Sequence, residues 1–420
     1  MGDFTYREGQ LHCEEVPLER IAEEVGTPFY CYSHAGLVRR WRAFSEAFAS
    51  VDHLVCYAMK ANSNLAILRL FINMGGGVDI VSGGELHRAL LAGADPSRIV
   101  FAGVGKSRGE IAEALRAGIL MFNVESLQEL EVVNNVAGEL GRTASVALRV
   151  NPDVDPATHP YIATGLRESK FGIAFAEALE AFRRAKEMDH LEVVGIHSHI
   201  GSQITQESPF VDALERLVVL VEKLRADGLA IRYLNLGGGL GITYKDESPP
   251  EPRQLAEALL PAMEDLGVTF IFEPGRVIVG NAGALVSRVL YTKAQPEKAF
   301  LVVDAAMNDL ARPSLYDAYQ AIWPVAEPDA EAPRVPVDVV GPVCESGDFL
   351  ARDRPLPPLG PGDLVAVMSA GAYGFTMASN YNSRPRAAEI LVVGSGYHVI
   401  RQRERYEDLV RGETVPDFLR

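Results

Sequence analysis

The chain has 420 residues, of which 48% are hydrophobic and 23% charged, a composition ordinary for a folded protein of about two domains. Its net charge of −16 argues against a nucleic-acid or anionic-membrane surface, because no basic patch stands out against the acidic background. No apolar stretch is long enough to cross a bilayer, and the N-terminal MGDFTYREGQ has no signal-peptide core. The scattered cysteines show neither metal-ligand nor disulfide spacing, so we expect a reduced, cytoplasmic protein.

From about residue 50, short apolar runs alternate with longer amphipathic segments. The apolar runs have the length of buried strands and cover residues 53–59, 77–82, 98–103, 119–124, 145–150, 191–199, 232–237 and 268–273. Between them lie helical patterns that often end at glycine, such as SGGELHRALLAG and SRGEIAEALRAG. About eight β-then-α repeats predict an α/β fold, a (β/α)8 TIM-like barrel over residues 30–281, with a doubly wound open sheet as the structural alternative.

After about residue 282 this alternation stops. Short β-like runs follow, separated by turns rich in proline and glycine, as in ALVSRVLYTK, VPVDVVG and AAEILVVGSG. The segment before residue 30 is also partly strand-like, in QLHCEEV. We therefore expect a C-terminal β-rich domain formed by residues 282–420 together with the N-terminal residues 1–29.

The stretch CYAMKAN (56–62) ends the first predicted strand on Lys60, followed by small and polar residues. A lysine at a strand end is usually solvated, but one at the rim of an apolar barrel can be a neutral amine that reacts with a carbonyl. Asp79 lies in the second predicted strand, and other polar residues end or follow later strands, namely Arg149, His197, His199, Glu273 and Arg276. Barrel active sites form at the carboxyl ends of the strands, so we expect these side chains to lie close together.

A glycine triplet, Gly237–Gly239, follows the seventh predicted strand. Alone it is more often a tight turn, but opposite a strand-end lysine it indicates a loop whose backbone N–H groups bind an anion, with Arg276 as a charged donor. A lysine, an anion-binding loop and a carboxylate on the last strand together suggest pyridoxal 5′-phosphate. Lys60 would then hold the aldehyde, and Glu273 would face the pyridine nitrogen.

The pair His197 and His199 leaves a metal site as an alternative, because residues i and i+2 at a twisted strand end can share a face. Metal-dependent hydrolases usually add further ligands at other strand ends, whereas the other histidines of this chain fall mostly in helices or loops. A metal would also leave the lysine and the glycine loop unexplained, so no metal ligands are assigned.

The chain carries, almost from end to end, the motifs YAMKAN (57–62), GGGVDIVSGGEL (75–86), TGLRESKFGI (164–173), GIHSHIGSQI (195–204), LGGGLGI (236–242), EPGR (273–276), ARPSLYDAY (311–319), GPVCESGD (341–348) and GAYGFTMASNYN (371–382). Through them it resembles the fold-type-III pyridoxal-phosphate-dependent decarboxylases, and within these the branch of diaminopimelate decarboxylase. The resemblance implies decarboxylation of meso-2,6-diaminopimelate at its D-centre to L-lysine and carbon dioxide, the last step of lysine biosynthesis.

The resemblance also implies roles for individual residues. Lys60 is placed as the Schiff-base lysine, His199 as the histidine stacked on the cofactor ring, and Cys344 as the proton donor; these three are the expected catalytic residues. The other expected cofactor contacts are Asp79, Arg149, Ser202, Gly238, Gly239, Glu273, Gly275, Arg276 and Tyr373. The expected substrate contacts are Arg276, Arg312, Tyr316, Glu345 and Tyr373, in which the arginines would bind the distal carboxylate and Glu345 the distal ammonium.

In this family the loop carrying Cys344 and Glu345 reaches the active site of a second subunit, which implies a homodimer with shared sites. Three alternatives remain open: a related decarboxylase of a basic or carrier-bound amino acid, an alanine-racemase-like enzyme, and a cofactor carrier without activity. The racemase is expected to place an arginine where this chain has Glu273, and carriers typically consist of the barrel alone.

Overall fold

The structure is a computed structural model in which residues 2–155 and 170–419 are described. It divides into two compact units, one formed by residues 39–278 and the other by residues 1–38 together with 279–420. The motif TGLRESKFGI lies outside the described residues up to position 169, as does most of the segment 151–170. Among the residues described, no helix is both long enough and apolar enough to span a bilayer.

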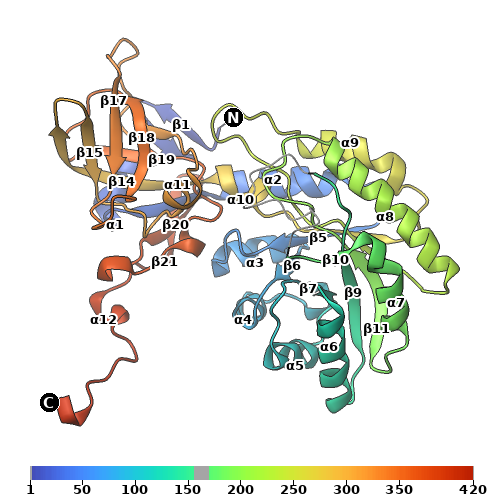
Figure 1. The fold of residues 1–420 in the computed structure, drawn as a ribbon. Coiled ribbons are helices and arrows are strands. Elements are labelled where there is room, and N and C mark those ends of the chain that lie inside the picture. Colours follow the sequence, from blue (N-terminus) through green and yellow to red (C-terminus); the bar gives the residue numbers. More distant parts are fainter. Residues whose placement is uncertain (1, 156–169, 420) are drawn as a thin grey trace. The chain divides into compact units, whose positions relative to one another are not determined.

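The first unit is a closed parallel barrel (Figure 1). Its strands are β5 (His53–Ala58), β6 (Gly77–Ile80), β7 (Ile99–Phe101), β8 (Met121–Val124), β9 (Ala144–Asn151), β11 (Leu191–His197), β12 (Tyr233–Asn235) and β13 (Thr269–Phe272). They pair in the order β9-β11-β12-β13-β5-β6-β7-β8, and a further β8–β9 pairing closes the ring. Each apolar run expected to be a strand coincides with one of these strands, and β9 extends one residue beyond its run at either end. The closed ring confirms the predicted barrel and excludes the open sheet.

Helices alternate with these strands along the chain. They are α2 (His34–Ala47), α3 (Leu65–Asn73), α4 (Gly83–Leu91), α5 (Arg108–Ala117), α6 (Leu127–Glu139), α7 (Ala178–Lys186), α8 (Ser208–Ala226), α9 (Pro252–Met263) and the single turn α10 (Arg276–Val279); the two-residue strand β10 (Ile173–Ala174) pairs with β9. The predicted helices in SGGELHRALLAG and SRGEIAEALRAG are confirmed as α4 and α5.

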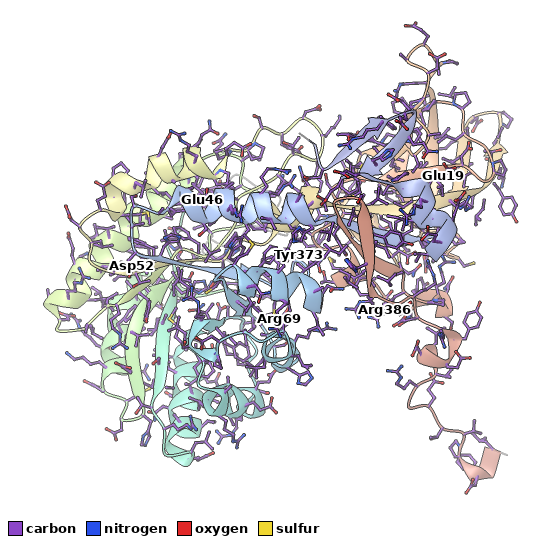
Figure 2. The ribbon with its side chains drawn as sticks, turned by 180° about the vertical axis from the view of Figure 1, so that it is seen from behind. Glu19, Glu46, Asp52, Arg69, Tyr373 and Arg386 are labelled. Atoms are coloured by element: carbon purple, nitrogen blue, oxygen red, sulfur yellow. The ribbon has the colours of Figure 1, made fainter. Side chains whose placement is uncertain are left out.

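Serine caps fix where three successive barrel helices begin. The hydroxyls of Ser82, Ser107 and Ser126 accept hydrogen bonds from backbone N–H groups three residues later, at the first turns of α4, α5 and α6. Such a cap satisfies a donor that the helix itself leaves unpaired, so it fixes the helix start. At the opposite end of the strands, Oδ2 of Asp52, labelled in Figure 2, accepts a hydrogen bond of 2.5 Å from Oγ1 of Thr269 and joins the start of β5 to β13.

The second unit is built on a large mixed sheet and a small antiparallel one. The large sheet runs β18-β17-β15-β14-β4-β20-β21, with β19 paired to β14 and β16 paired to β19. Its strands are β4 (Phe29–Ser33), β14 (Gly283–Ala294), β15 (Ala299–Val303), β16 (Ile322–Pro324), β17 (Val335–Val340), β18 (Phe349–Leu356), β19 (Leu364–Val367), β20 (Ala388–Val393) and β21 (Gly396–Arg401). The small sheet and the short helices of this unit are β1 (Phe4–Arg7), β2 (Gln10–Cys13), β3 (Val16–Pro17), α1 (Leu18–Val25), α11 (Arg312–Tyr316) and α12 (Tyr406–Leu409).

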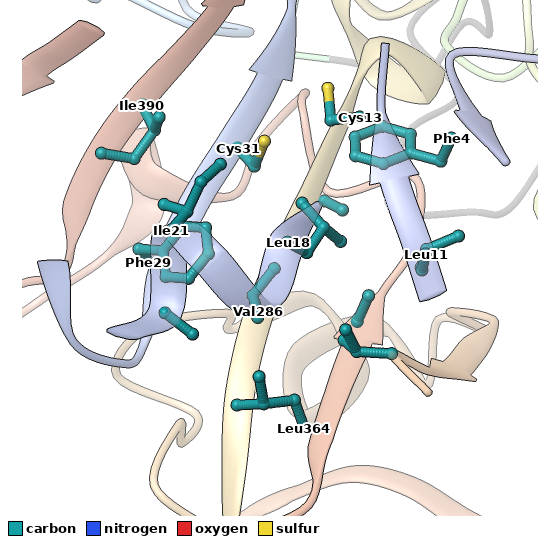
Figure 3. Close-up of a cluster of buried hydrophobic side chains, with 14 of the residues drawn as sticks. Phe4, Leu11, Cys13, Leu18, Ile21, Phe29, Cys31, Val286, Leu364 and Ile390 are labelled. Atoms are coloured by element: carbon teal, nitrogen blue, oxygen red, sulfur yellow. The ribbon is translucent and has the colours of Figure 1, made fainter. Parts of the chain in front are cut away.

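One apolar core joins the two ends of the chain within this unit (Figure 3). Leu18 and Ile21 of α1 lie in a cluster with Phe29 of β4, Val286 of β14 and Ile390 of β20. β4 begins at Phe29 and pairs with β14 antiparallel and with β20 parallel, so an N-terminal strand lies in the middle of a mostly C-terminal sheet. The N-terminal segment therefore belongs to the β-rich fold through main-chain pairing as well as packing.

Helix α4 offers a test of how much of the barrel's stability comes from its buried helix faces. Leu86 is 3% exposed and Leu91 is 57% exposed on the same helix. We expect Leu86→Ala to lower the free energy of unfolding by about 2–5 kcal/mol, because it leaves a cavity in the core. Leu91→Ala should change it by less than about 0.5 kcal/mol. Urea denaturation of both variants measures this, and equal effects would contradict the packing described for α4.

Candidate active site

The turn that carries Lys60 packs against the segment after the last barrel strand. The backbone N–H of Ala58 donates to the carbonyl of Pro274 at 3.1 Å. A Cβ atom on Gly275 would lie only 3.1 Å from the Cβ of Ala61 and 3.2 Å from that of Ala58. Glycine at position 275 therefore suits this close approach, which brings the motifs YAMKAN and EPGR together.

The Lys60 amine faces a buried carboxylate. Its Nζ lies 3.2 Å from Oδ2 of Asp79, which is fully buried on β6, whereas the lysine side chain is 39% exposed. Burial and the negative charge of Glu273 raise the pKa of Asp79 to about 8, although Lys60 opposes the shift. The lysine thus sits at the rim of the barrel with its amine held above strand β6.

Glu273 follows β13 and is surrounded by polar side chains of three other strands. Its Oε1 accepts hydrogen bonds from Nδ2 of Asn123 at 3.2 Å and from Nδ2 of Asn235 at 2.6 Å. Its Oε2 lies 3.5 Å from Nε2 of His197. Burial alone would raise the pKa of Glu273, but the neighbouring His197, followed by Lys60 and the hydrogen bond from Asn235, lowers it to about 2. This carboxyl group is therefore an anion inside the barrel.

The glycine loop after β12 fits closely against two neighbouring segments. A Cβ on Gly238 would lie 2.2 Å from the carbonyl oxygen of Glu273, and one on Gly239 2.5 Å from that of Gly201. The Gly238 N–H donates to Nδ1 of His199 at 3.1 Å. Burial, and then the charges of Arg149 and Lys60, lower the pKa of His199 well below its usual value. His199 is therefore a neutral imidazole whose Nδ1 accepts a hydrogen bond.

Two buried arginines flank this loop. Nη1 of Arg276 donates to the Tyr244 hydroxyl at 2.5 Å, and its Nη2 donates to Oγ of Ser202 at 3.1 Å. Nη1 of Arg149 donates to Oε1 of Glu125 at 2.7 Å, at the end of the neighbouring strand β8. Of the ten expected site residues between Lys60 and Arg276, Asp79 and Arg149 lie in the carboxyl-terminal halves of β6 and β9, and the others follow barrel strands.

The remaining expected site residues lie in the β-rich unit. Cys344 is exposed, and its backbone N–H donates to Oδ1 of Asn382 at 3.0 Å. Glu345 accepts a short hydrogen bond from the hydroxyl of Tyr381. Tyr373 lies at φ 54°, in the left-handed region that side chains other than glycine rarely adopt.

Helix α11 is joined to the turn that carries Cys344 and Glu345. Oγ of Ser314 donates to the carbonyl of Gly347 at 2.5 Å. The guanidinium of Arg312, the first residue of α11, lies 5.7 Å from the ring centroid of Tyr316, the last. The structure therefore brings the expected substrate residues Arg312, Tyr316 and Glu345 into one part of this unit.

Sequence reasoning missed four residues of the barrel site: Asn123, Glu125, Asn235 and Tyr244. Asn123 and Asn235 are fully buried within β8 and β12. A polar side chain inside the apolar runs ILMFNV and RYLNLG is the signal that could have identified them, because a buried amide needs a partner. The signal for Glu125 is its place directly after a strand.

The two histidines serve different contacts in the structure. His197 faces Glu273, whereas His199 accepts from the glycine loop. In residues 2–155 and 170–419, no group of three or more His, Cys, Asp or Glu side chains is arranged to hold a metal ion.

The barrel residues fit the three polar groups of pyridoxal phosphate. Lys60 offers an amine for the aldehyde, and Glu273 offers a buried anion for the ring nitrogen. Gly238 and Gly239 leave no room for a side chain, so backbone can approach a phosphate there, close to the buried Arg276. The arrangement can bind this cofactor and stabilise a positive charge on its ring.

Comparisons with known proteins agree with this geometry. Residues 34–280 match the family model described as the pyridoxal binding domain of pyridoxal-dependent decarboxylases. The chain is 54% identical over 415 residues to a diaminopimelate decarboxylase of Pseudomonas aeruginosa, covering 99% of both chains. A diaminopimelate decarboxylase structure from Helicobacter pylori, complexed with L-lysine, has a TM-score of 0.90 at 45% identity, covering 94% of this chain and 98% of that one. One from M. jannaschii, also with L-lysine, has a TM-score of 0.93 at 40% identity, covering 99% and 98%.

Asp79 should give the folded state a characteristic pH dependence. Its folded pKa of about 8 lies above the unfolded value of about 3.9, so the unfolded state releases this proton first as pH rises. The free energy of unfolding should therefore fall between pH 5 and 8, by at most about 1.4 kcal/mol per pH unit for one proton. The lowered pKa of Glu273 changes the free energy of unfolding only below about pH 4.5, so it adds nothing to the change between pH 5 and 8.

Replacing Asp79 by Asn should remove this contribution. We expect the Asp79→Asn variant to be more stable than the wild type at pH 8 and nearly equal to it at pH 5, in urea denaturation. A difference between the two proteins that is the same at both pH values would show that Asp79 is ionised in the folded state throughout.

Proposed function

The chain belongs to the family of pyridoxal-dependent decarboxylases, and from this membership we propose that it removes carbon dioxide from the D-centre of meso-2,6-diaminopimelate to give L-lysine. The observation that carries the proposal is the end-to-end match to diaminopimelate decarboxylases, together with an amine and a charged carboxylate at the rim of one barrel. This reaction is the last step of lysine biosynthesis. The four free cysteines support a reducing, cytoplasmic location.

Pyridoxal phosphate is the cofactor, and when bound it supplies an electron sink for the electron pair that departing carbon dioxide leaves behind. Lys60 supplies the amine that binds the aldehyde. Glu273 holds a proton at the ring nitrogen, because a buried carboxylate of low pKa stabilises a positive charge beside it. The buried Asp79, whose raised pKa keeps it protonated near neutral pH, adds no negative charge beside the amine.

The remaining barrel residues would hold the cofactor in place. We assign His199 to the face of the ring, because a neutral imidazole can pack there without a charge. Ser202, Gly238, Gly239, Gly275 and Arg276 would hold the phosphate, with Tyr373 as a further contact. Arg149, fixed by Glu125, would support the cofactor end of the site. We assign cofactor binding to the barrel unit, residues 39–278.

The β-rich unit, residues 1–38 and 279–420, would supply the substrate contacts other than Arg276. Arg312 and Arg276 would bind the distal carboxylate as planar donors, and Glu345 would accept hydrogen bonds from the distal ammonium. Only a substrate that carries both groups can make all of these contacts. Tyr316 and Tyr373 would add hydroxyl groups. The Sγ–H of the exposed Cys344 would deliver a proton to the carbon from which carbon dioxide has left.

The substrate is tested by release of carbon dioxide from the purified protein with pyridoxal phosphate. Meso-diaminopimelate should be decarboxylated, whereas ornithine, lysine and arginine should not, because they lack the distal carboxylate. Lys60→Ala is the control and should lose both the activity and the near-visible absorbance of bound cofactor. If the wild type shows the absorbance of bound cofactor but releases no carbon dioxide from diaminopimelate, the substrate is one of the other amino acids.

We propose that the active protein is a homodimer in which Cys344 and Glu345 serve the active site of the partner subunit. The exposure of Cys344 on a turn supports this arrangement. Lys60→Ala and Cys344→Ala should each be inactive alone. After mixing and subunit exchange, about a quarter of the wild-type activity should return, because half of the random dimers are hybrids with one intact site each.

A matched control distinguishes shared sites from simple refolding. Mixing Lys60→Ala with Glu273→Ala should restore nothing, because both residues lie in the same barrel and every site keeps a defect. No recovery in either mixture would contradict shared sites and leave each subunit with its own Cys344.

A further inference from the structure

We infer that His197 is a positioning residue that, with Asn123 and Asn235, fixes which oxygen of Glu273 faces the ring nitrogen of bound cofactor. The inference rests on the proposed function, because it concerns the cofactor site assigned there. It assigns Oε2, and not Oε1, to the ring nitrogen.

Oε1 of Glu273 is already occupied by protein donors. The Nδ2 atoms of Asn123 and Asn235 both donate to it, at 3.2 Å and 2.6 Å, from strands β8 and β12. Both asparagines are fully buried, and a buried amide needs a hydrogen-bond partner. A carboxylate oxygen accepts about two hydrogen bonds, so Oε1 has little capacity left for a third donor.

Oε2 lies on the side of His197. Nε2 of His197 is 3.5 Å away, which is an ion-pair distance and longer than a good hydrogen bond. The His197 side chain is 1% exposed, and neither of its ring nitrogens has a hydrogen-bond partner among the described residues. A buried polar ring without a partner is costly, so its place beside Oε2 indicates a role in the site rather than in packing.

The charges around Glu273 favour the same assignment. His197 is the largest influence that lowers the pKa of Glu273 against burial, followed by Lys60. The negative charge of Glu273 also acts on two other acidic groups, Asp79 and Cys56. Burial, together with this charge, raises the pKa of both. The negative charge is therefore on Glu273, with Oε1 bound by two amides and Oε2 beside Nε2 of His197.

The ring nitrogen of the cofactor reports on this arrangement directly. The probe is pyridoxal 5′-phosphate labelled with 15N in the ring, and the reading is the 15N chemical shift in the loaded enzyme, which separates a protonated from an unprotonated ring. We expect a protonated ring in the wild type. In His197→Leu we expect a shift towards the unprotonated value and a fall in kcat of roughly tenfold, as for one pKa unit, with little change in KM.

Two further variants separate positioning from structure. His197→Gln places an amide N–H near the position of Nε2 and should retain most of the wild-type shift and kcat. Val194→Ala, on the same strand and buried in the apolar barrel interior, should lower stability without moving the 15N shift. A wild-type shift in the loaded His197→Leu enzyme would overturn the inference.

If His197→Leu does not load cofactor, His197→Asn replaces it. The amide of Asn is one carbon shorter than that of Gln and should not reach Oε2, so equal shifts in the two variants would also overturn the inference. The 15N signal needs only bound cofactor. Absence of activity on diaminopimelate in the wild type would therefore reject the proposed substrate while leaving this measurement to decide the role of His197.

Discussion

The buried negative charge of Glu273 is the interaction on which the barrel site depends. Moving a carboxylate out of water costs several kcal/mol unless donors and opposite charges replace the water. Here the replacements come from β8, β11 and β12, which are separate in sequence and meet only because the ring of strands is closed. An open sheet could not surround one carboxylate in this way, so the closed barrel is a condition for the chemistry.

The same interior drives two carboxyl groups to opposite states. Glu273 has donors and cationic neighbours and stays ionised, whereas Asp79 shares its burial but has Glu273 as a like charge, and its pKa rises to about 8. Groups whose pKa values are pushed apart by their surroundings are those that an enzyme uses for separate roles. Lys60 lies beside the carboxyl that is neutral near pH 7, whereas the negative charge between these two groups stays on Glu273.

The sequence predicted the barrel strands because each is a compact apolar run, and it predicted the strand-end residues because parallel strands place their ends on one face. It did not identify Asn123 and Asn235, since their role is set by Glu273, which is distant in the chain. Nor could it assign the run FYCYS to a sheet, because β4 pairs with β14 and β20. β18 was missed for a local reason: FLARDRPL mixes charged residues and a proline into the strand.

The four cysteines show how burial restricts the chemistry of a thiol. Burial raises the pKa of the thiols of Cys13 and Cys56, which lie in apolar clusters and cannot exchange protons with water or substrate. Cys344 is exposed on a turn whose backbone is fixed by Asn382 and by Asp348. A proton donor must be re-protonated after each cycle, and that requires contact with solvent or a proton relay. The exposed thiol meets this requirement, whereas the buried thiols are restricted to packing.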